Sequence, residues 1–520
     1  MYKIIKGTIM KRVIKYITVV VSAVTLTACS DDFLEVEPRG ESLESNYYRN
    51  AEEAYNGVVA AYDPVGWVGQ NYVAKEFALN AASDDFYAGG GNSQDVPAVQ
   101  AWSSYTLEPA TGPQEELWRR SYSGIYRTNV LLSKLPDTDM DEHLKSRFEA
   151  EMKFLRAYYY FDLIRLFERV PMFTEPVAVS DLGNAVQVDR SEVFTLIEQD
   201  LVEAVPNLPT EVNLATEAGR ATQGAGKALL GKVYLHLERF GEAAQQFQDV
   251  NGTPGGTSQY GYRLLENYGD LFENENQFNE ESIFEVIHTS ASNWGDWNCI
   301  GCTEGNLLNQ MSAPRGYNII EQGKGAPDFI AGWGFNIPTE KLADAFIYSD
   351  GSYDNRYKHT LSNLDSLAQQ GIISYEKSYQ DTGYFLKKFA GKQEDRSTGG
   401  GNFELNWPQN FYDIRLADTY LLEAEALVRG GGDTNRAQAL LDAVRSRVGE
   451  ESVPATFSNI LRERRLELAG EGHRWFDLQR AGLAAEYLQF KGYVSKKHDK
   501  LPIPLQDLTN TQLEQDPAYQ

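Results

Sequence analysis

The sequence predicts a mostly α-helical protein that contains a large irregular, loop-rich region. Apolar residues recur at helical spacing in several segments before residue 251 and again over residues 414–448. Between about residues 251 and 410 this period is lost, and Gly, Asn, Trp and Tyr dominate. The 520 residues are 42% hydrophobic, so the chain can bury a sizeable core without a disulfide scaffold.

The charge balance excludes some classes of partner. Asp and Glu number 74 against 48 Lys and Arg, which gives a formal net charge of −26. A protein this acidic is repelled by phosphate backbones and by anionic membrane surfaces, so nucleic acid is not an expected ligand. Aromatic residues make up 12% of the chain, a surplus that must be buried or used for binding.

The first residues have the pattern of an export signal. Residues 1–28 contain basic residues and no acid, and an apolar run too short to span a membrane ends at Cys29. Leu-Thr-Ala-Cys resembles a bacterial lipobox, in which the signal peptide is removed and the cysteine is lipidated. We therefore expect a signal peptide (1–28) and a lipidated tether (29–45), followed by the body of the chain (46–520). A plain secretory signal is the alternative, and Met10 is a possible second start.

Individual helices follow from the apolar spacing and from capping residues. Asn50 with Glu53 forms a capping-box pattern, and Asp63-Pro64 is expected to end that helix. Further helices are expected around 118–136, from about 144 to 166, and from 191 to 206.

Two segments are expected to form helical hairpins. Residues 224–250 place two amphipathic runs around a central glycine, and residues 414–448 do so around Gly430-Gly431-Gly432, with Asp433 as a cap. The small residues at their contacts, such as Gly231, resemble tetratricopeptide units. The units are scattered along the chain, which argues against a simple solenoid.

Several kinds of catalytic or cofactor site have no support. The Gly-rich runs lack the context of a nucleotide site, no HExxH occurs, and no Gly-x-Ser-x-Gly elbow is present. No cofactor or metal is therefore expected, and a calcium ion bound by loop carboxylates remains the alternative. Two carboxylates suffice for a glycosidase, but with 74 acids such pairs arise by chance.

Aromatic residues in the non-periodic stretches are the strongest binding signal. Trp294 and Trp297 lie three residues apart in a polar loop with Asn293 and Asp296. Flat rings match the apolar face of a sugar, and amide and carboxylate groups match its hydroxyls. Further candidates for the same glycan site in the loops about 63–111 and 251–410 are Trp67, Trp333, Tyr87, Asp84, Asp85 and Asn92. Core packing remains the alternative for each loop tryptophan taken alone.

The last two cysteines form a Cys-x-x-Cys pattern. Cys299 and Cys302 follow Trp297 in a Gly-rich loop and lack the strand-to-helix context of a redox motif. In an oxidising compartment we expect a disulfide that braces the loop. Free thiols or a metal remain the alternatives.

The helical segments resemble the SusD/RagB-like family of outer-membrane lipoproteins over essentially the full length. The most specific stretch is Glu463–Arg480, which contains Gly-Glu-Gly-His-Arg-Trp-Phe-Asp. Other matching segments are 151–171, Arg127-Thr-Asn129, Asp354-Asn-Arg356, 415–426 and Leu501-Pro-Ile-Pro504. Their Arg, Glu and Asp residues beside aromatics indicate scaffold contacts, and we assign them no ligand role.

The resemblance implies that residues 46–520 form a single domain, a SusD-like helical scaffold with tetratricopeptide-like pairs on one side and a variable binding half. It implies a non-enzymatic surface lipoprotein that captures polysaccharide or oligosaccharide and passes it to a SusC-like TonB-dependent outer-membrane transporter. The binding surface would draw on residues 63–105 and 290–335. The acidic charge favours a neutral glycan. A surface-anchored glycoside hydrolase and an assembly adaptor for a transporter complex remain the alternatives.

Overall fold

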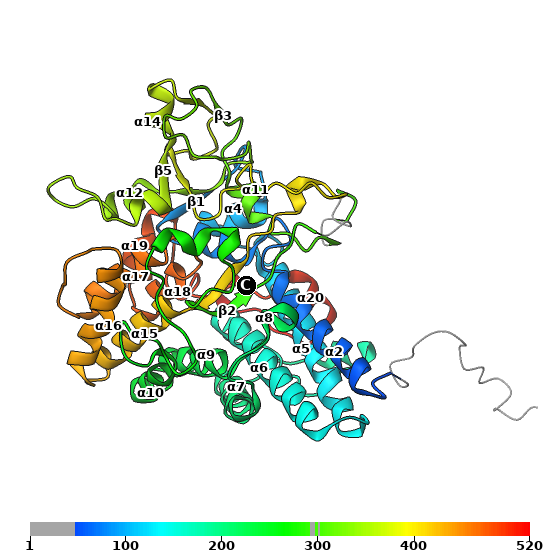
Figure 1. Ribbon diagram of the computed structural model, residues 1–520. Helices are drawn as coiled ribbons and strands as arrows, with labels where there is room; N and C mark the ends of the chain where they lie inside the picture. Colours follow the sequence, from blue (N-terminus) through cyan, green and yellow to red (C-terminus); the bar gives the residue numbers. More distant parts are fainter. Residues whose placement is uncertain (1–46, 292–296, 300–301) are drawn as a thin grey trace, which may run out of the picture. The chain divides into compact units, whose positions relative to one another are not determined.

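Helices dominate both ends of the described chain, and the middle holds short strands and loops (Figure 1). The structure is a computed structural model that describes residues 47–291, 297–299 and 302–520. Residues Asn50–Gln520 form one unit. Among the described residues, none of the helices combines the length and apolar character that crossing a membrane requires.

The first helical group confirms the expected amphipathic segments. It comprises α2 (Ala51–Gly66), α5 (Gln114–Lys134), α6 (Glu142–Phe167) and α7 (Arg190–Ala204). Each of these helices packs against the next one in this order. Asn50 Oδ1 accepts a hydrogen bond from the backbone N–H of Glu53 at 3.0 Å, which is the predicted cap.

The predicted end of α2 at Asp63-Pro64 is wrong, because the helix continues to Gly66. Pro64 has no N–H and cannot donate to the carbonyl of Ala60 one turn earlier. Arg127 of α5 supplies the missing donor: its Nη1 lies 2.8 Å from the Ala60 oxygen, and it also pairs with Asp63. A side chain from a neighbouring helix thus bonds the Ala60 carbonyl that Pro64 leaves without a donor, and α2 can continue past the proline.

Both expected hairpins are present. The first pairs α9 (Gln223–His236) with α10 (Phe240–Asn251), and the second pairs α15 (Leu416–Arg429) with α16 (Thr434–Arg447). Gly231 allows the first pair to approach closely, since a Cβ there would lie 2.7 Å from the Phe247 ring. Asp433 caps α16 as predicted. Although distant in sequence, the two hairpins meet because α10 packs against α15.

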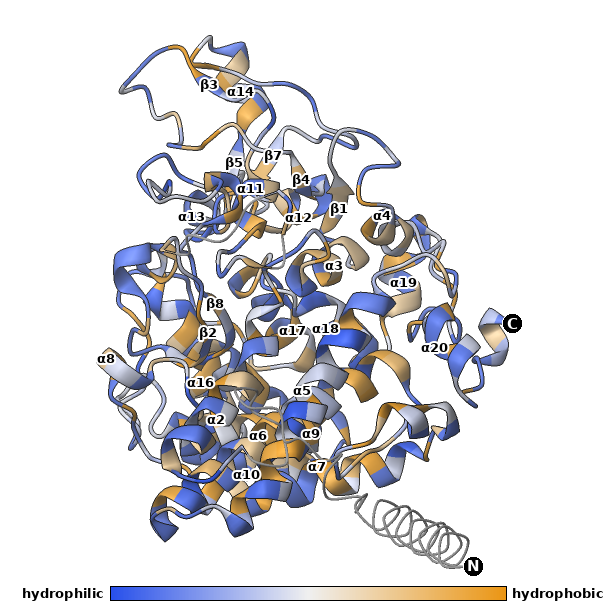
Figure 2. Ribbon diagram, turned by 90° about the vertical axis from the view of Figure 1, so that its right-hand side faces the viewer, coloured by the Kyte–Doolittle hydropathy of each residue, from blue (hydrophilic) through white to orange (hydrophobic). Residues whose placement is uncertain are grey.

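The remaining helices are shorter. They are α3 (Lys75–Ala82), α4 (Pro97–Ser103), α8 (Leu214–Glu217), α11 (Leu308–Ser312), α12 (Glu340–Ala345), α13 (Tyr357–Thr360), α14 (Leu364–Gln369), α17 (Phe457–Glu467), α18 (Arg474–Arg480), α19 (Ala484–Leu488) and α20 (Leu505–Asn510). In Figure 2, α10 carries both hydrophobic and hydrophilic residues, and its buried side includes Ala243, Phe247 and Val250.

The strands of the described residues form two-stranded antiparallel sheets. The pairs are β1 (Phe86–Gly89) with β4 (Phe335–Pro338), β2 (Ser282–Val286) with β8 (Phe411–Arg415), β3 (Asn318–Ile319) with β6 (Ile373–Ser374), and β5 (Leu361–Asn363) with β7 (Tyr384–Leu386). In the first pair Tyr87 faces Ile337 and Gly89 faces Phe335. This pairing brings the segment that follows α3 beside the middle insertion.

A buried group of ion pairs joins the C-terminal helices, and we call it the scaffold charge cluster. Its members are Glu281, Arg356, Arg415, Arg447, Glu463, Glu467 and Glu471. Arg415 Nη1 lies 2.7 Å from Glu467 Oε1, and Arg356 Nη1 lies 3.1 Å from Glu467 Oε2. Burial alone would raise the pKa of Glu467, but the guanidinium groups of Arg447, Arg415 and Arg356 hold that pKa well below its usual range. The predicted scaffold role is confirmed for the members that lie in the matching segments, which are Arg356, Arg415, Glu463, Glu467 and Glu471.

Candidate glycan-binding site

Three aromatic rings from separate loops form a row, which we call the aromatic platform. Trp333 is the central ring: its centroid lies 5.8 Å from that of Tyr72 and 5.9 Å from that of Trp297. The ring planes are tilted by 36° and 41° respectively. Trp297 is 43% exposed, and Tyr72 and Trp333 are partly buried. The predicted residues Trp297 and Trp333 are therefore brought together.

Backbone hydrogen bonds fix the central ring. Trp333 N–H donates to the carbonyl of Gln310 at 3.1 Å, and the next residue donates to Ala313 at 2.8 Å. Gly332 permits this close approach, because a Cβ there would lie 2.5 Å from the Gln310 oxygen. Trp333 is thus held against the end of α11, immediately before β4.

Tyr72 is held on the same support. Leu307 N–H donates to the carbonyl of Gly69 at 2.8 Å, and Asn71 Oδ1 accepts from Val73 N–H at 2.7 Å. A Cβ at Gly69 would lie 2.9 Å from the His288 ring, so a side chain there would push this loop away. Tyr72 is not among the residues predicted from the sequence, although its polar neighbours in a non-periodic stretch are the same signal that singled out Trp294 and Trp297.

A disulfide in the structure lies next to the outermost ring. Cys299 and Cys302 are bonded, with their Cα atoms 5.3 Å apart. Cys302 N–H also donates to the carbonyl of Cys299 at 3.1 Å. Trp297 therefore directly precedes a cross-linked turn. The predicted ligands Asn293, Trp294 and Asp296 lie outside the described residues.

Polar groups stand beside the platform. Arg315 Nη1 donates to the Trp333 carbonyl at 3.3 Å, and within the described residues Arg315 forms no ion pair. Asp95 Oδ2 accepts from Gly91 N–H at 2.8 Å, and burial together with the Asp95 charge raises the pKa of Tyr72. Asn92 is exposed in the same loop, and its role as a ligand stays a prediction. A guanidinium and a carboxylate here can bond sugar hydroxyls.

The prediction that Asp84 and Asp85 bind sugar hydroxyls is wrong. Both residues are 1% exposed, since they form ion pairs with two arginines of the C-terminal helices. Asp84 Oδ1 lies 2.8 Å from Arg474 Nε, and Asp85 pairs with Arg465. Burial alone would raise the pKa of Asp84, yet the two arginines hold it below its usual value. These carboxylates join α3 to the scaffold and cannot reach a surface ligand.

Trp67 and Tyr87 contact residues of the scaffold. The Trp67 ring lies 5.2 Å from the Arg119 guanidinium and 5.3 Å from that of Arg127, both on α5. Tyr87 is half-buried against the hydrophobic cluster around Ile337, and Lys491 Nζ lies 5.5 Å from its ring. The structure therefore places neither ring in the platform row.

Comparison with solved structures gives the family. A protein described as a laminarin-binding SusD-like protein is 49% identical to this chain, covers 91% of it and 100% of its own length, and superposes with a TM-score of 0.86. This chain belongs to the SusD family. The SusD family model matches residues 355–512, and a model described as "Starch-binding associating with outer membrane" matches residues 32–235.

Two other SusD-like proteins match over most of the chain. Surface glycan-binding protein A from Bacteroides thetaiotaomicron, solved in complex with laminarihexaose, is 26% identical with a TM-score of 0.78, and the match covers 90% of this chain and 99% of that one. Starch-binding protein SusD from the same species is 25% identical, with 80% of both chains covered. The SusD-like helical scaffold expected from the sequence is confirmed.

Within the described ranges, no group of three or more His, Cys, Asp and Glu side chains could hold a metal ion.

Proposed function

We propose that this SusD-family protein captures a neutral glucan of the laminarin type on the aromatic platform and does not cleave it. The observation that carries the proposal is the row formed by Tyr72, Trp333 and Trp297, which presents tilted rings on loops anchored to a rigid helical scaffold. Each ring face matches the C–H face of one pyranose, and Arg315 and Asp95 are placed to bond its hydroxyls.

The tilt between the rings favours a chain that is not flat. Adjacent ring planes differ by 36° and 41°, so a flat ribbon cannot lie against every ring. Chains of β-1,3-linked glucose coil, whereas β-1,4-linked glucans extend. The laminarin-binding relative at 49% identity and the laminarihexaose complex of a second relative support the same choice.

We further propose that Cys29 carries a lipid anchor at the outer face of the outer membrane, and that the glycan passes to a SusC-like TonB-dependent transporter. The lipobox-like sequence and the acidic residues that follow Cys29 support the anchor. The family description of outer-membrane association supports the location. Loss of fatty-acid labelling in Cys29→Ala would support lipidation, and co-purification with a transporter would support delivery.

Calorimetry with laminarihexaose tests the platform. Trp333→Ala, Trp297→Ala and Tyr72→Ala should each cost about 1–3 kcal/mol of binding free energy, or about 5- to 150-fold in Kd. Trp333→Ala should have the largest effect, because it removes the ring that contacts both neighbours. Tyr126→Ala on α5 removes a 44%-exposed aromatic from the scaffold and is the matched control. Unchanged affinity in all three platform variants would refute the site.

Two further assays separate the alternatives. Reducing ends released from laminarin by the pure protein would favour a glycoside hydrolase. Co-purification with a transporter without binding to any glycan would favour an assembly adaptor. Tighter binding of a uronate polymer than of every neutral glucan would contradict the predicted ligand class.

A further inference from the structure

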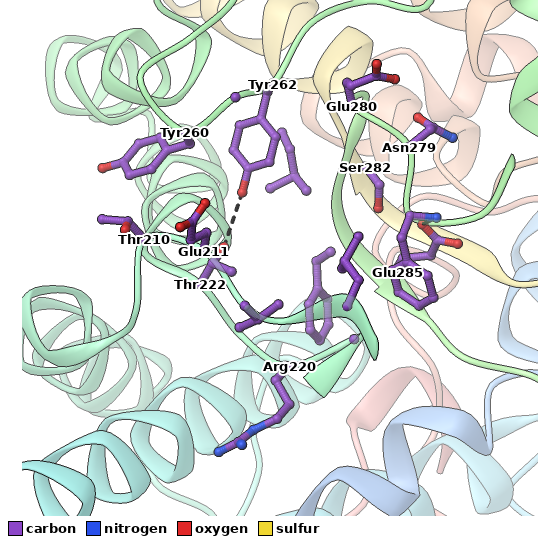
Figure 3. Close-up of a pocket in the computed structure, with 17 residues that line it drawn as sticks. Thr210, Glu211, Arg220, Thr222, Tyr260, Tyr262, Asn279, Glu280, Ser282 and Glu285 are labelled. Atoms are coloured by element: carbon purple, nitrogen blue, oxygen red, sulfur yellow. Dashed lines mark hydrogen bonds between the residues drawn. The ribbon is translucent and has the colours of Figure 1, made fainter. Parts of the chain in front are cut away.

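A cavity lies beside β2, and we call it the β2 pocket. Its volume is about 260 Å³, and it is formed by the segment before α9, the turn at residues 260–262 and the start of β2. Figure 3 shows Thr210, Glu211, Tyr260 and Tyr262 on one side and Asn279, Glu280, Ser282 and Glu285 on the other. Its lining shares no residue with the three rings of the platform.

Aromatic side chains form part of the wall. The Tyr260 and Tyr262 rings lie 6.0 Å apart, and Phe278 contributes to the opposite side. Tyr262 is fixed in place because its hydroxyl lies 3.2 Å from Thr222 Oγ1. Tyr260 and Phe278 are only partly buried, so ring surface remains available to a ligand.

The charges around the pocket select against an anion. Arg220 lines the pocket, but its guanidinium bonds Glu151 at 2.6 and 2.9 Å and Glu217 at 2.6 Å. In the described part of the chain, Thr210 and Glu211 have no side-chain partner and are exposed at the rim. The unoccupied polar groups therefore include a hydroxyl and a carboxylate, which suit the hydroxyl groups of an uncharged ligand.

The volume limits the size of that ligand. Sites for drug-sized ligands occupy ~300–1,000 Å³, and this pocket is smaller. Apolar ring surface beside hydroxyl-bonding groups, in a cavity of this size, matches one pyranose unit. A long glycan would need a chain end or a side branch to enter.

We propose that the β2 pocket is a second glycan-binding site, which takes a single neutral pyranose unit of the polymer held by the platform. This proposal rests on the proposed function for its choice of glycan. Two sites on one chain would bind a long polymer more tightly than a short one, because the second contact becomes intramolecular.

Saturation-transfer NMR with methyl β-D-glucoside, alongside calorimetry with laminarihexaose and laminarin, tests this site on the whole chain. In Trp297→Ala/Trp333→Ala, which removes two platform rings, transfer to the glucoside should persist. Adding Glu211→Ala/Tyr260→Ala should abolish it. In the otherwise native chain, Glu211→Ala/Tyr260→Ala should weaken laminarin binding about 3- to 10-fold and laminarihexaose binding less.

Several outcomes would overturn the pocket. The first is loss of saturation transfer in the platform variant while the pocket is still native. The second is transfer that persists in the platform variant after Glu211→Ala/Tyr260→Ala has been added. The third is a loss of transfer in the control Tyr126→Ala as large as that in the pocket variant. Thr210→Trp, which fills the pocket from its rim without removing a buried group, should also abolish transfer in the platform variant. If the native protein binds no laminarihexaose yet transfer still depends on Glu211 and Tyr260, the pocket stands and the proposed platform ligand fails.

Discussion

The buried scaffold and the aromatic platform both contain a pair of tryptophans in contact, with opposite results for their exposure. Trp102 and Trp475 are 0% and 1% exposed and meet edge to face, with centroids 5.4 Å apart. Trp297 and Trp333 also meet, but both keep ring surface exposed. The first pair fills the interior between short helices, whereas the second stands on loops that the helices support.

Charged groups differ in the same way. Glu467 is fully buried and bonded to three arginines, whereas Arg315 at the platform bonds only a carbonyl oxygen within the described residues. Partners inside the protein satisfy the first group, so it can contribute only to the fold. The second retains free donors for a ligand. Perturbing each region separately should therefore affect stability in one case and binding in the other.

Arg415→Leu should cause the largest loss of stability, because it removes the central arginine of the scaffold charge cluster. The change leaves Glu281, Glu467 and Glu471 buried without this partner, which should cost about 3–5 kcal/mol of unfolding free energy. Urea unfolding followed by circular dichroism measures this loss. Arg263→Leu, which removes an exposed pair with Glu280, is the matched control and should leave the midpoint unchanged. Equal midpoints in the two variants would contradict the role of the cluster.

Glu76→Gln should change how the free energy of unfolding depends on pH, because Glu76 is a buried carboxyl group of the scaffold. Burial raises the pKa of Glu76 to about 8, and its Oε1 has no hydrogen-bond partner. The unfolded chain loses this proton near pH 4.5 and the folded chain keeps it to about pH 8. Stability from this group is thus complete below pH 4.5 and is lost as the pH rises to 8.

The glutamine variant removes that titration, so at pH 9 it should be more stable than the native chain by a few kcal/mol. Urea midpoints measured from pH 5 to 9 test this expectation. A native and a variant profile of equal slope would show that Glu76 ionises normally in the folded protein.

Cys299→Ser/Cys302→Ser should weaken the platform more than the fold. The disulfide closes a very short loop, so its loss should cost no more than about 2 kcal/mol of stability. Freed from the cross-linked turn, Trp297 should lose order, and laminarihexaose affinity should fall about 2- to 5-fold. Adding the cysteine changes to Trp297→Ala should then cause no further loss of affinity. A further loss of equal size would mean that the disulfide acts through other residues.

Asp95→Asn should give the smallest effect. The amide oxygen can still accept from Gly91 N–H, so only the charge beside Tyr72 is removed, and affinity should change about twofold or less. Asp84→Asn is the scaffold counterpart: it should lower the thermal midpoint while the folded protein binds laminarihexaose normally. A large loss of laminarihexaose affinity in folded Asp84→Asn would show that Asp84 contributes to binding and would contradict its scaffold role.

The helical half could be predicted because helical spacing is local. Apolar residues three and four apart define one face of a helix whatever lies opposite, and caps such as Asn50 and Asp433 act within three residues. The extension of α2 beyond Pro64 escaped prediction, because the donor that permits it comes from Arg127 on another helix.

The platform could be predicted only in part because it depends on contacts between distant loops. Trp297 and Trp333 stood out by residue type, but Tyr72 joins them through the backbone pairing of Leu307 with Gly69. Asp84 and Asp85 had the residue type of sugar ligands, yet partners almost 400 positions later, Arg465 and Arg474, bury them. The sequence around Asp84 and Asp85 contains no local pattern that separates these buried aspartates from Asp95, which lies beside the platform.

The pairing of β1 with β4 has a consequence for the order of folding. It joins Gly89 to Phe335, so a very long loop must close before Tyr72 and Trp333 can meet. Contacts of such long range form slowly compared with the local helical hairpins. Binding competence should therefore appear only after the helices have assembled, and recovery of glucan affinity during refolding would report completion of the entire domain.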